Sequence, residues 1–246
     1  MDKINEIIHK INNSQNIAVL TGAGVSTDSG IPDFRSTGGL WSSGESREYY
    51  MSTDYYSKHP MDFWRKYKEI FQMKLAQEYT PNITHSYLKR LEDVGKNVTI
   101  ITQNVDGLHK KAGSKHVIEY HGTLTTASCP NCSQRYPLSY IMKEEVPYCE
   151  RCHIPLKPDV ILFGDMIQEH EKAEAAINHS NLILVLGTSL LVGPFNLLPE
   201  LGVIRNIPSI LINRESTSKD GLFDIVKLGE LKPIMTILNN SLTGES

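Results

Sequence analysis

The stretch Ile17-Ala-Val-Leu-Thr-Gly-Ala-Gly24 joins a short apolar run to two closely spaced glycines. Consecutive apolar residues bounded by polar ones are typical of a buried strand in a parallel sheet. Glycines after such a strand let the backbone approach a phosphate group, whose charge the following amides bind. A tight structural turn gives the same glycine spacing, so the rest of the chain must decide between the two interpretations.

Outward from this stretch, short apolar runs alternate with segments whose apolar residues recur at helical spacing. The alternation predicts an α/β fold with a parallel sheet covered by helices on both faces. The expected strands span residues 17–20, 98–101, 117–120, 160–163, 182–186 and 209–212. The expected helices cover 4–11, 63–74, 84–95 with Thr84 as a possible cap, 169–179 and 231–239, and residues 36–56 are expected to be irregular.

Polar or glycine-bearing groups follow strand after strand, and parallel sheets bind their ligands beyond the carboxyl ends of the strands. The groups are Gly22 and Gly24, then Gln103, Asn104 and Asp106, then His121, then Gly187, Thr188 and Ser189, then Asn213. Together they predict an active site. Structural alternatives stay open for single residues. His121 suits a general base but also an exposed or structural histidine. Asp106 is equally a helix cap, and Asp33 with Arg35 equally a surface ion pair.

The glycine stretch differs from the usual dinucleotide fingerprint of oxidoreductases. Thr27 stands where a third glycine is expected, and the region around Glu45 does not resemble a strand that ends in an acidic residue. The difference disfavours an NAD(P) oxidoreductase.

The four cysteines form two pairs, Cys129 with Cys132 and Cys149 with Cys152, in the pattern CxxC-x16-CxxC. This spacing is typical of a tetrahedral four-thiolate zinc site. Four thiolates fill the coordination sphere, so the zinc is expected to be structural; His153 is not needed as a ligand. Redox-active or uncoordinated thiols are the alternative.

The chain has 246 residues, 25 Lys and Arg, 28 Asp and Glu and a net charge of −3, with 40% hydrophobic residues. These values are typical of a globular protein and disfavour a dedicated nucleic-acid binder. The zinc module has a net charge of only +1, from Arg135, Lys143, Arg151 and Lys157 against Glu144, Glu145 and Glu150. Gly187, Pro194 and other breakers interrupt the uncharged stretch 175–199, so no membrane span is expected. With no export signal, the expected location is the cytoplasm; the oligomeric state is open, and a monomer is plausible.

Seven motifs occur in one order that resembles the sirtuin family of NAD-dependent protein deacylases. They are GAGVSTDSGIPDFR at 22–35, TQNVDGLH at 102–109, HG at 121–122, the cysteine pairs, PDVILFG at 158–164, GTSL at 187–190 and IN at 212–213. The resemblance runs from about residue 14 to the last helix. It implies a Rossmann-like domain (1–37, 84–126 and 156–246) and a smaller domain made of a helical insertion (38–83) and a zinc module (127–155).

The resemblance also implies residue roles. Catalysis falls to His121 and Asn104. NAD is expected to contact Gly22, Ala23, Gly24, Ser26, Thr27, Ile31, Asp33, Phe34, Arg35, Gln103, Val105, Asp106, Gly187, Thr188, Ser189, Asn213 and Leu231. The acyl-lysine peptide is expected to pair as a strand with Val160, Phe163 and Gly164 on one side and Val192 on the other. Zinc is assigned to Cys129, Cys132, Cys149 and Cys152.

The implied reaction releases nicotinamide from NAD and moves the acyl group of a modified lysine to ADP-ribose, with His121 as the base. The products are free lysine, nicotinamide and O-acyl-ADP-ribose. Mono-ADP-ribosyltransfer to protein is the first rival, and a non-enzymatic zinc-ribbon binding module is another. Retention of His121 and of a full peptide groove favours deacylation.

Three departures from the family pattern bear on specificity. Asp165 stands where many members carry Glu, a mild change at the peptide groove. Tyr67 is followed at the third position by Ile70 rather than by the Arg of desuccinylases, so acetyl is expected before acidic or longer acyl groups. The motif near the last strand is degenerate, which leaves the adenine contact at Leu231 as the weakest assignment.

Overall fold

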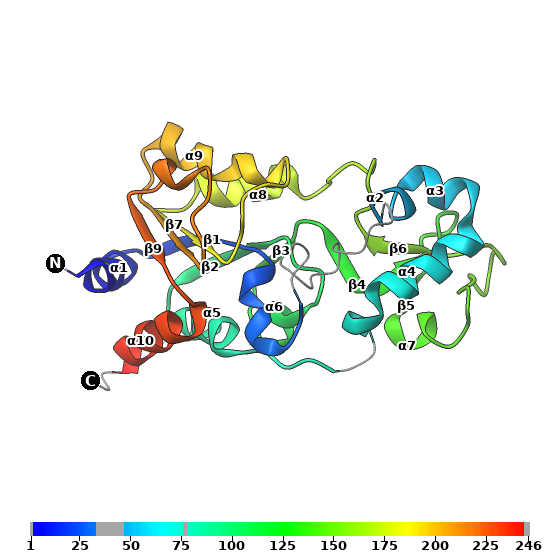
Figure 1. The fold of residues 1–246 in the computed structure, drawn as a ribbon, viewed down its shortest axis with the longest axis horizontal. Coiled ribbons are helices and arrows are strands. Elements are labelled where there is room, and N and C mark those ends of the chain that lie inside the picture. Colours follow the sequence, from blue (N-terminus) through cyan, green and yellow to red (C-terminus); the bar gives the residue numbers. More distant parts are fainter. Residues whose placement is uncertain (1, 33–46, 76–77, 244–246) are drawn as a thin grey trace.

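The computed structural model describes residues 2–32, 47–75 and 78–243, which contain two β-sheets. The larger sheet lies at one end of the molecule and the smaller sheet at the other (Figure 1). The six parallel strands of the larger sheet are β1 (Asn16–Thr21), β2 (Asn97–Thr102), β3 (Val117–Glu119), β7 (Leu182–Leu186), β8 (Ser209–Asn213) and β9 (Ile225–Leu228). The three antiparallel strands of the smaller sheet are β4 (Gly122–Ser128), β5 (Arg135–Pro137) and β6 (Lys157–Val160).

The strand order in the larger sheet is β3-β2-β1-β7-β8-β9, so the chain runs outward from β1 in both directions. Thr21 at the end of β1 lies beside Thr102 of β2 and Leu186 of β7. The loops that follow these three strands therefore leave the sheet at one place. In open parallel sheets this switch of direction creates a crevice at the carboxyl edge, where ligands bind.

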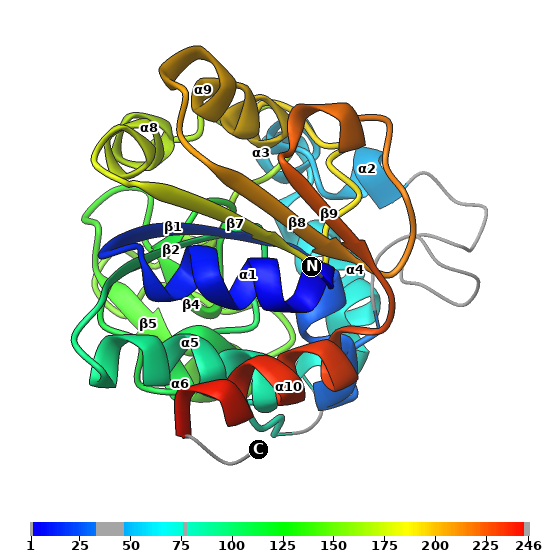
Figure 2. The ribbon, with the colours of Figure 1, turned by 90° about the vertical axis from the view of Figure 1, so that its left-hand side faces the viewer.

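Helices cover both faces of the larger sheet, as the sequence predicts (Figure 2). One face carries α1 (Lys3–Asn12), α5 (Ile83–Asp93) and α10 (Leu231–Thr243). The other face carries α8 (His170–Asn178) and α9 (Leu198–Arg205). The short helix α6 (Leu108–Lys111) and the 3-10 turns 23–25, 27–29, 195–197 and 220–222 lie in the connections.

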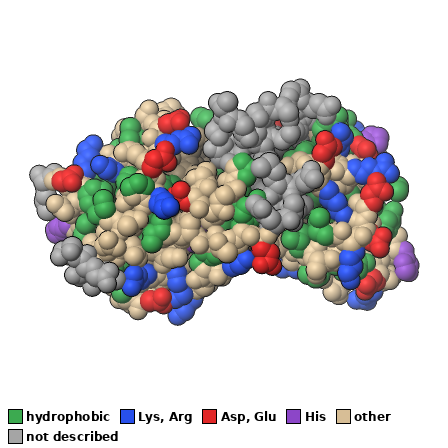
Figure 3. All heavy atoms as spheres, turned by 60° about the horizontal axis from the view of Figure 1, so that its bottom comes forward, with side chains coloured by type: hydrophobic (Ala, Val, Ile, Leu, Met, Phe, Trp, Pro, Cys, Tyr) green, Lys and Arg blue, Asp and Glu red, His purple; other side chains and the backbone are tan. Residues whose placement is uncertain are grey.

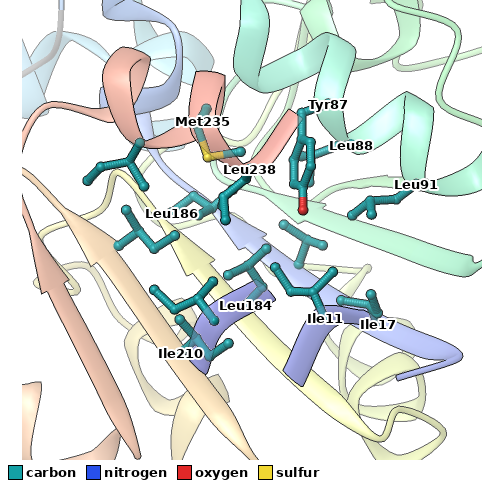
Figure 4. Close-up of a cluster of buried hydrophobic side chains, with 14 of the residues drawn as sticks. Ile11, Ile17, Tyr87, Leu88, Leu91, Leu184, Leu186, Ile210, Met235 and Leu238 are labelled. Carbon is teal, nitrogen blue, oxygen red and sulfur yellow. The ribbon is translucent and has the colours of Figure 1, made fainter. Parts of the chain in front are cut away.

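Residues along each central strand alternate between two hydrophobic cores, because successive side chains of a strand point to opposite faces. Ile17 and Val19 join the core beneath α1, α5 and α10, whereas Ala18 and Leu20 join the core beneath α8 and α9. Figure 4 shows the first core, in which Leu184, Leu186 and Ile210 of the sheet face Tyr87, Leu88, Met235 and Leu238 of the helices.

The smaller sheet shares a third core with the helices α2 (Arg47–Tyr50), α3 (Thr53–Lys58), α4 (Pro60–Leu75) and α7 (Leu138–Ile141). Trp64 is fully buried there, and its indole nitrogen donates a hydrogen bond to the carbonyl of Leu156 (2.7 Å). The helices and the cysteine segment thus stabilise each other although they are far apart in sequence.

Three expectations about local structure are wrong. Of the stretch 36–56 that was expected to be irregular, residues 47–50 and 53–56 are helical, in α2 and α3. Residues 160–163 are not a strand of the parallel sheet: the strand spans Lys157–Val160 and pairs with β4 in the smaller sheet. Thr84 does not cap α5; the side chain of Asn82 accepts the hydrogen bond from the Thr84 amide, and His85 completes the capping box. The sheet assignment failed because an apolar run does not say which strand it pairs with. The cap was misplaced because Asn82, a preferred cap residue two positions earlier, was not considered. The domain boundaries themselves stay a prediction.

Among the described residues, no helix combines the length and the apolar character that crossing a membrane requires.

Candidate active site

A cleft of about 880 Å³ lies at the carboxyl ends of β1, β2, β7 and β8 and extends to the segment after β6. Figure 3 shows two lobes joined by a narrower middle. The residues predicted for the site that line the cleft are Ala23, Gly24, Thr27, Gln103, Asn104, Val105, His121, Val160, Phe163, Gly164, Gly187, Thr188, Ser189, Val192, Asn213 and Leu231. The structure therefore gathers most of the predicted side chains around one space.

The glycine loop after β1 packs backbone to backbone against the loop after β7. The Gly24 amide donates to the carbonyl of Gly187 (2.9 Å), and the Gly22 amide donates to the carbonyl of Leu186 (3.1 Å). A Cβ atom at Gly24 would lie 2.9 Å from the Cα of Gly187, closer than side chains tolerate. Glycine is required here because two chain segments approach each other at the cleft, so the loop is more than an isolated turn.

Asn104, which lines the cleft, forms one hydrogen-bonded group with two polar side chains that do not line it. The Ser26 hydroxyl donates to Asp106 Oδ2 (2.8 Å), and Asn104 Nδ2 donates to Ser26 Oγ and to the carbonyl of Gly22 (both 3.1 Å). Asp106 Oδ1 also accepts from the amide of Leu108 at the start of α6, so the helix-capping interpretation is confirmed, and its predicted role in the site stays a prediction. Asn104 and Ser26 are buried, and this pairing fixes their orientation.

Two further polar contacts lie at the strand ends, one between two loops and one within the loop after β8. Gln103 Nε2 donates to the hydroxyl of Thr188 (2.8 Å), which holds the loops after β2 and β7 together. Asn213 Nδ2 donates to the carbonyl of Glu215 (2.7 Å). Leu231, the first residue of α10, lies against Gly187, so the start of this helix faces the cleft.

His121 lies between the two sheets and lines the cleft. Burial lowers the pKa of its imidazole to about 4, although a hydrogen bond with the backbone of Gln103 favours the charged form. Gly122 follows with φ +75°, and a Cβ atom there would lie 2.0 Å from the carbonyl oxygen of Asp159. Only glycine allows the chain to turn into β4 at this point, which explains the pair His121-Gly122 in physical terms.

The segment expected to bind the peptide, around Phe163 and Gly164, is joined by backbone hydrogen bonds to the helical lobe, the part of the chain that contains α2, α3 and α4. The Thr53 amide donates to the carbonyl of Phe163, and the Phe163 amide donates to the carbonyl of Met51 (both 3.0 Å). Asp165 Oδ1 accepts from Thr53 Oγ1 (2.5 Å) and Lys157 Nζ (2.7 Å), and Oδ2 accepts from the Leu162 amide (3.0 Å). Hydrogen bonds from Lys157 and Thr53 lower the pKa of Asp165 against the opposing effect of burial.

Some predicted residues do not line the cleft. Gly22, Ser26, Ile31 and Asp106 lie behind its wall, where they support the lining residues. Asp33, Phe34 and Arg35 lie outside the described residues, so their predicted roles stay predictions.

The sequence analysis missed several lining residues, namely Glu48, Met51, Phe71, Ile161, Leu162, Ile167, Leu191, Gly193, Pro194, Arg214, Glu215 and Glu230. Ile161 and Leu162 lie between Val160 and Phe163, which were predicted to contact the peptide, so the family resemblance could have included them. Met51 and Phe71 carry no pattern of their own, because only the packing of the helical lobe brings them to the cleft.

The four cysteines lie together at the end of the smaller sheet, with all their sulfur atoms within 4.8 Å of one another. Cys132 Sγ and Cys149 Sγ are 3.7 Å apart, which matches the edge of about 3.8 Å for four sulfurs at about 2.3 Å from one zinc ion. The Cys132 amide donates to Cys129 Sγ and the Cys152 amide to Cys149 Sγ (3.5 and 3.4 Å). The cysteines are therefore positioned to bind a zinc ion.

Residues 22–194 match the Sir2 family. The chain is 48% identical over 248 residues to an NAD-dependent protein deacetylase 2 of Geobacillus kaustophilus, covering 100% of both chains. It is 46% identical over 241 residues to an NAD-dependent protein deacetylase of Bacillus subtilis, covering 94% of this chain and 96% of the relative.

Two solved structures show the same fold. A Sir2 protein in complex with a p53 peptide and NAD+ superimposes with a TM-score of 0.84 at 32% identity, covering 99% of each chain. A Sir2 variant with deacetylated p53 peptide and 3'-O-acetyl-ADP-ribose superimposes with a TM-score of 0.86 at 30% identity, covering 98% of each chain.

Proposed function

The chain belongs to the Sir2 family, and on that premise we propose that it is an NAD-dependent protein-lysine deacetylase with His121 as the general base. One observation supports this most strongly. A single cleft is lined by the glycine loop, by Gln103 and Asn104, by Thr188 and by His121, and it reaches the segment at Phe163. The relatives' names and the solved complexes agree with this chemistry.

We assign the NAD site to the loops after β1, β2, β7 and β8. Backbone at Gly24 and Gly187 can approach a pyrophosphate because neither residue has a side chain. The hydrogen bond between Gln103 and Thr188 fixes two polar groups beside it. Asn104 lines the cleft at the expected nicotinamide end, and its hydrogen bond to Ser26, which in turn donates to Asp106, holds the Asn104 amide in one orientation.

NAD, when bound, supplies the ribose that accepts the acetyl group as nicotinamide leaves. The contribution of His121 is to take a proton from a ribose hydroxyl, so that this oxygen can attack the acetyl carbon. A pKa of about 4 keeps the imidazole neutral, and so able to accept a proton, at physiological pH. One water molecule is consumed when the carbon–nitrogen bond to lysine breaks, and the products are the free lysine, nicotinamide and O-acetyl-ADP-ribose.

We assign the acetyl-lysine peptide to the strip between Gly164 and Val192. The amide and carbonyl of Phe163 already pair with residues 51 and 53, so the peptide strand is expected on the opposite edge of this segment. Cys129, Cys132, Cys149 and Cys152 would hold the zinc, which contributes to the fold of the smaller lobe and takes no part in the reaction. The cytoplasmic location, the lack of a nucleic-acid partner and the oligomeric state stay predictions.

The test compares wild type with His121→Ala in nicotinamide release from NAD and an acetyl-lysine peptide. We expect wild type to release nicotinamide only with the peptide, and the variant to lose at least about 100-fold in kcat. His116→Ala, at an exposed histidine nearby in the sequence, is the matched control and should behave as wild type. Unchanged turnover of His121→Ala would refute the role of His121. Peptide-independent release with ADP-ribose on protein would replace deacetylation by ADP-ribosyltransfer.

A further inference from the structure

A buried tyrosine directly precedes His121 and has no part in the mechanism above. Tyr120 is fully buried, and its hydroxyl lies 2.6 Å from His170 Nδ1 at the start of α8. His170 Nε2 lies 3.4 Å from Glu174 Oε1 one turn further along the helix. In the tautomer with the proton on Nε2, Tyr120 donates to His170 and His170 donates to Glu174. This chain of contacts anchors the tyrosine ring to α8.

The ring of Tyr120 is also part of an aromatic contact with His121. The ring centroids of Tyr120 and His121 are 5.3 Å apart in an edge-to-face arrangement. Phe195, which is fully buried, lies 5.3 Å from Tyr120 and 6.4 Å from His121. Edge-to-face contacts of this kind favour one orientation of each ring. The imidazole therefore has two aromatic neighbours, neither of which lines the cleft.

We propose that Tyr120 is a positioning residue for His121, held in place by His170 and packed with Phe195 as a wall that orients the imidazole. The proposal rests on the proposed function of His121 as the base. A base must lie within hydrogen-bond reach of the proton it abstracts, and a small misplacement of a reacting group is costly in rate. Tyr120 touches no reacting atom. Its contribution is to orient the imidazole of His121 and to keep water away from it.

The charges around this group agree with an anchoring role. Burial, with the nearby negative charge of Glu174 as a lesser cause, raises the pKa of Tyr120 to about 12, so the hydroxyl keeps its proton and remains a donor. The lowered pKa of His121 comes mainly from burial, and a looser wall would admit water. The pKa of His121 therefore reports on the wall independently of turnover.

The experiment compares two variants with wild type. Tyr120→Phe removes only the hydroxyl, and His170→Ala removes the hydrogen-bond partner of that hydroxyl, a partly exposed side chain at the start of α8. His179→Ala is the control, at an exposed histidine near the other end of α8. Each protein is assayed with NAD and an acetyl-lysine peptide. The imidazole signals of each are titrated by NMR, with the His121 signal assigned from His121→Ala.

We expect both test variants to lose about two- to tenfold in kcat, the effect of one lost hydrogen bond behind a catalytic group, with the KM for NAD unchanged. The pKa of His121 should move up from about 4 toward 6.5 in both, and the control should match wild type. Unchanged kcat with an unchanged His121 pKa in both variants would overturn the proposal. If wild type shows no deacetylation, the proposed function has failed, and the NMR titration still decides whether Tyr120 orients His121.

Discussion

At the scale of single residues, His121 faces the cleft although most of its imidazole is shielded from solvent. Its imidazole lines the cleft, yet burial lowers its pKa to about 4. A base whose pKa is lowered in this way stays neutral across the range in which an ordinary histidine becomes charged. We therefore expect kcat/KM to be nearly level from pH 8 down to pH 5.5.

The pH profile of the initial rate checks this expectation. A base with the unperturbed pKa of about 6.5 would retain only about a tenth of its activity at pH 5.5. Circular dichroism at each pH shows that the protein is still folded. An acid limb centred near pH 6.5 in folded protein would contradict the buried, neutral state of His121.

Two other histidines are buried within the larger domain of the fold. The rings of His85 and His109 are in contact, tilted by 54° with their centroids 4.7 Å apart, and His109 Nε2 lies 3.1 Å from the hydroxyl of Thr21. Burial lowers the pKa of His85 to about 4 and that of His109 to about 3, with the neighbouring His85 contributing to the latter. The free energy of unfolding should therefore decrease on acidification.

The direction follows from proton uptake. Above about pH 6.5 these histidines are neutral in both states and contribute no pH dependence; below it the unfolded chain binds protons that the folded chain refuses. Each histidine then removes up to about 1.4 kcal/mol of stability per pH unit, until the folded-state pKa near 3 to 4 is reached. Urea unfolding at pH 7.5, 6.5 and 5.5 measures this slope. His109→Asn should flatten it and exposed His116→Ala should not; a slope that is equal in all three proteins would refute the assignment.

At the scale of elements, Asp165 connects three segments that approach the cleft separately. It accepts hydrogen bonds from Thr53 of α3, from Lys157 of β6 and from the Leu162 amide beside the candidate peptide strip. Asp165→Ala should release this strip and raise the KM for the acetyl-lysine peptide by about tenfold. The KM for NAD should not change, because the NAD loops belong to other strands.

The control for this variant is Asp54→Ala on α3, the helix whose residue Thr53 contacts Asp165. Asp54 forms a surface ion pair with Lys58, and both side chains are more than half exposed (66% and 64%). Steady-state kinetics with each substrate varied separately distinguishes the two effects. Equal peptide KM values for Asp165→Ala and Asp54→Ala would show that Asp165 has no part in holding the strip.

The comparison between pattern and structure is also instructive at this scale. The buried strand at Leu182–Leu186 and the helix around Ile7 could be predicted because their apolar residues follow the period of one element. Residues 160–163 misled the same reasoning, since an apolar run does not say which sheet it joins. β9 and most of α9 were not predicted. In α9, Val203 and Ile204 are apolar yet exposed, which blurs the amphipathic pattern.

The residues of the candidate site also fall into those that the sequence predicts and those that it does not. His121, Gln103 and Thr188 were predictable because each directly follows a strand of the parallel sheet, and such loops meet at one edge. Met51 and Phe71 reach the cleft only through the packing of the helical lobe, and Tyr120 acquires its partner His170 from a helix 50 residues away. Contacts of this kind depend on tertiary structure and leave no local signal in the sequence.

At the scale of the whole molecule, the zinc site is expected to hold the smaller lobe together. The cysteine turns share one core with α3 and α4, and the backbone of Met51 and of Thr53, the first residue of α3, is hydrogen-bonded to the peptide strip at Phe163. Removal of zinc by a strong chelator should lower the Tm by at least about 10 °C, because zinc binding energy contributes to folding. Cys149→Ser should have the same effect without chelator.

Calorimetry combined with metal analysis checks this prediction, and return of the Tm after zinc is added back is the control. An unchanged Tm in protein shown to have lost its metal would contradict a structural role of the cysteine site.

The central claim is that one cleft couples cleavage of NAD to removal of an acetyl group from lysine. The measurement that tests it most directly is the stoichiometry of products by mass spectrometry after incubation of the protein with NAD and an acetyl-lysine peptide. The account predicts equal amounts of nicotinamide, deacetylated peptide and O-acetyl-ADP-ribose. Nicotinamide formed without an equal amount of deacetylated peptide, or deacetylated peptide formed without NAD, would contradict it.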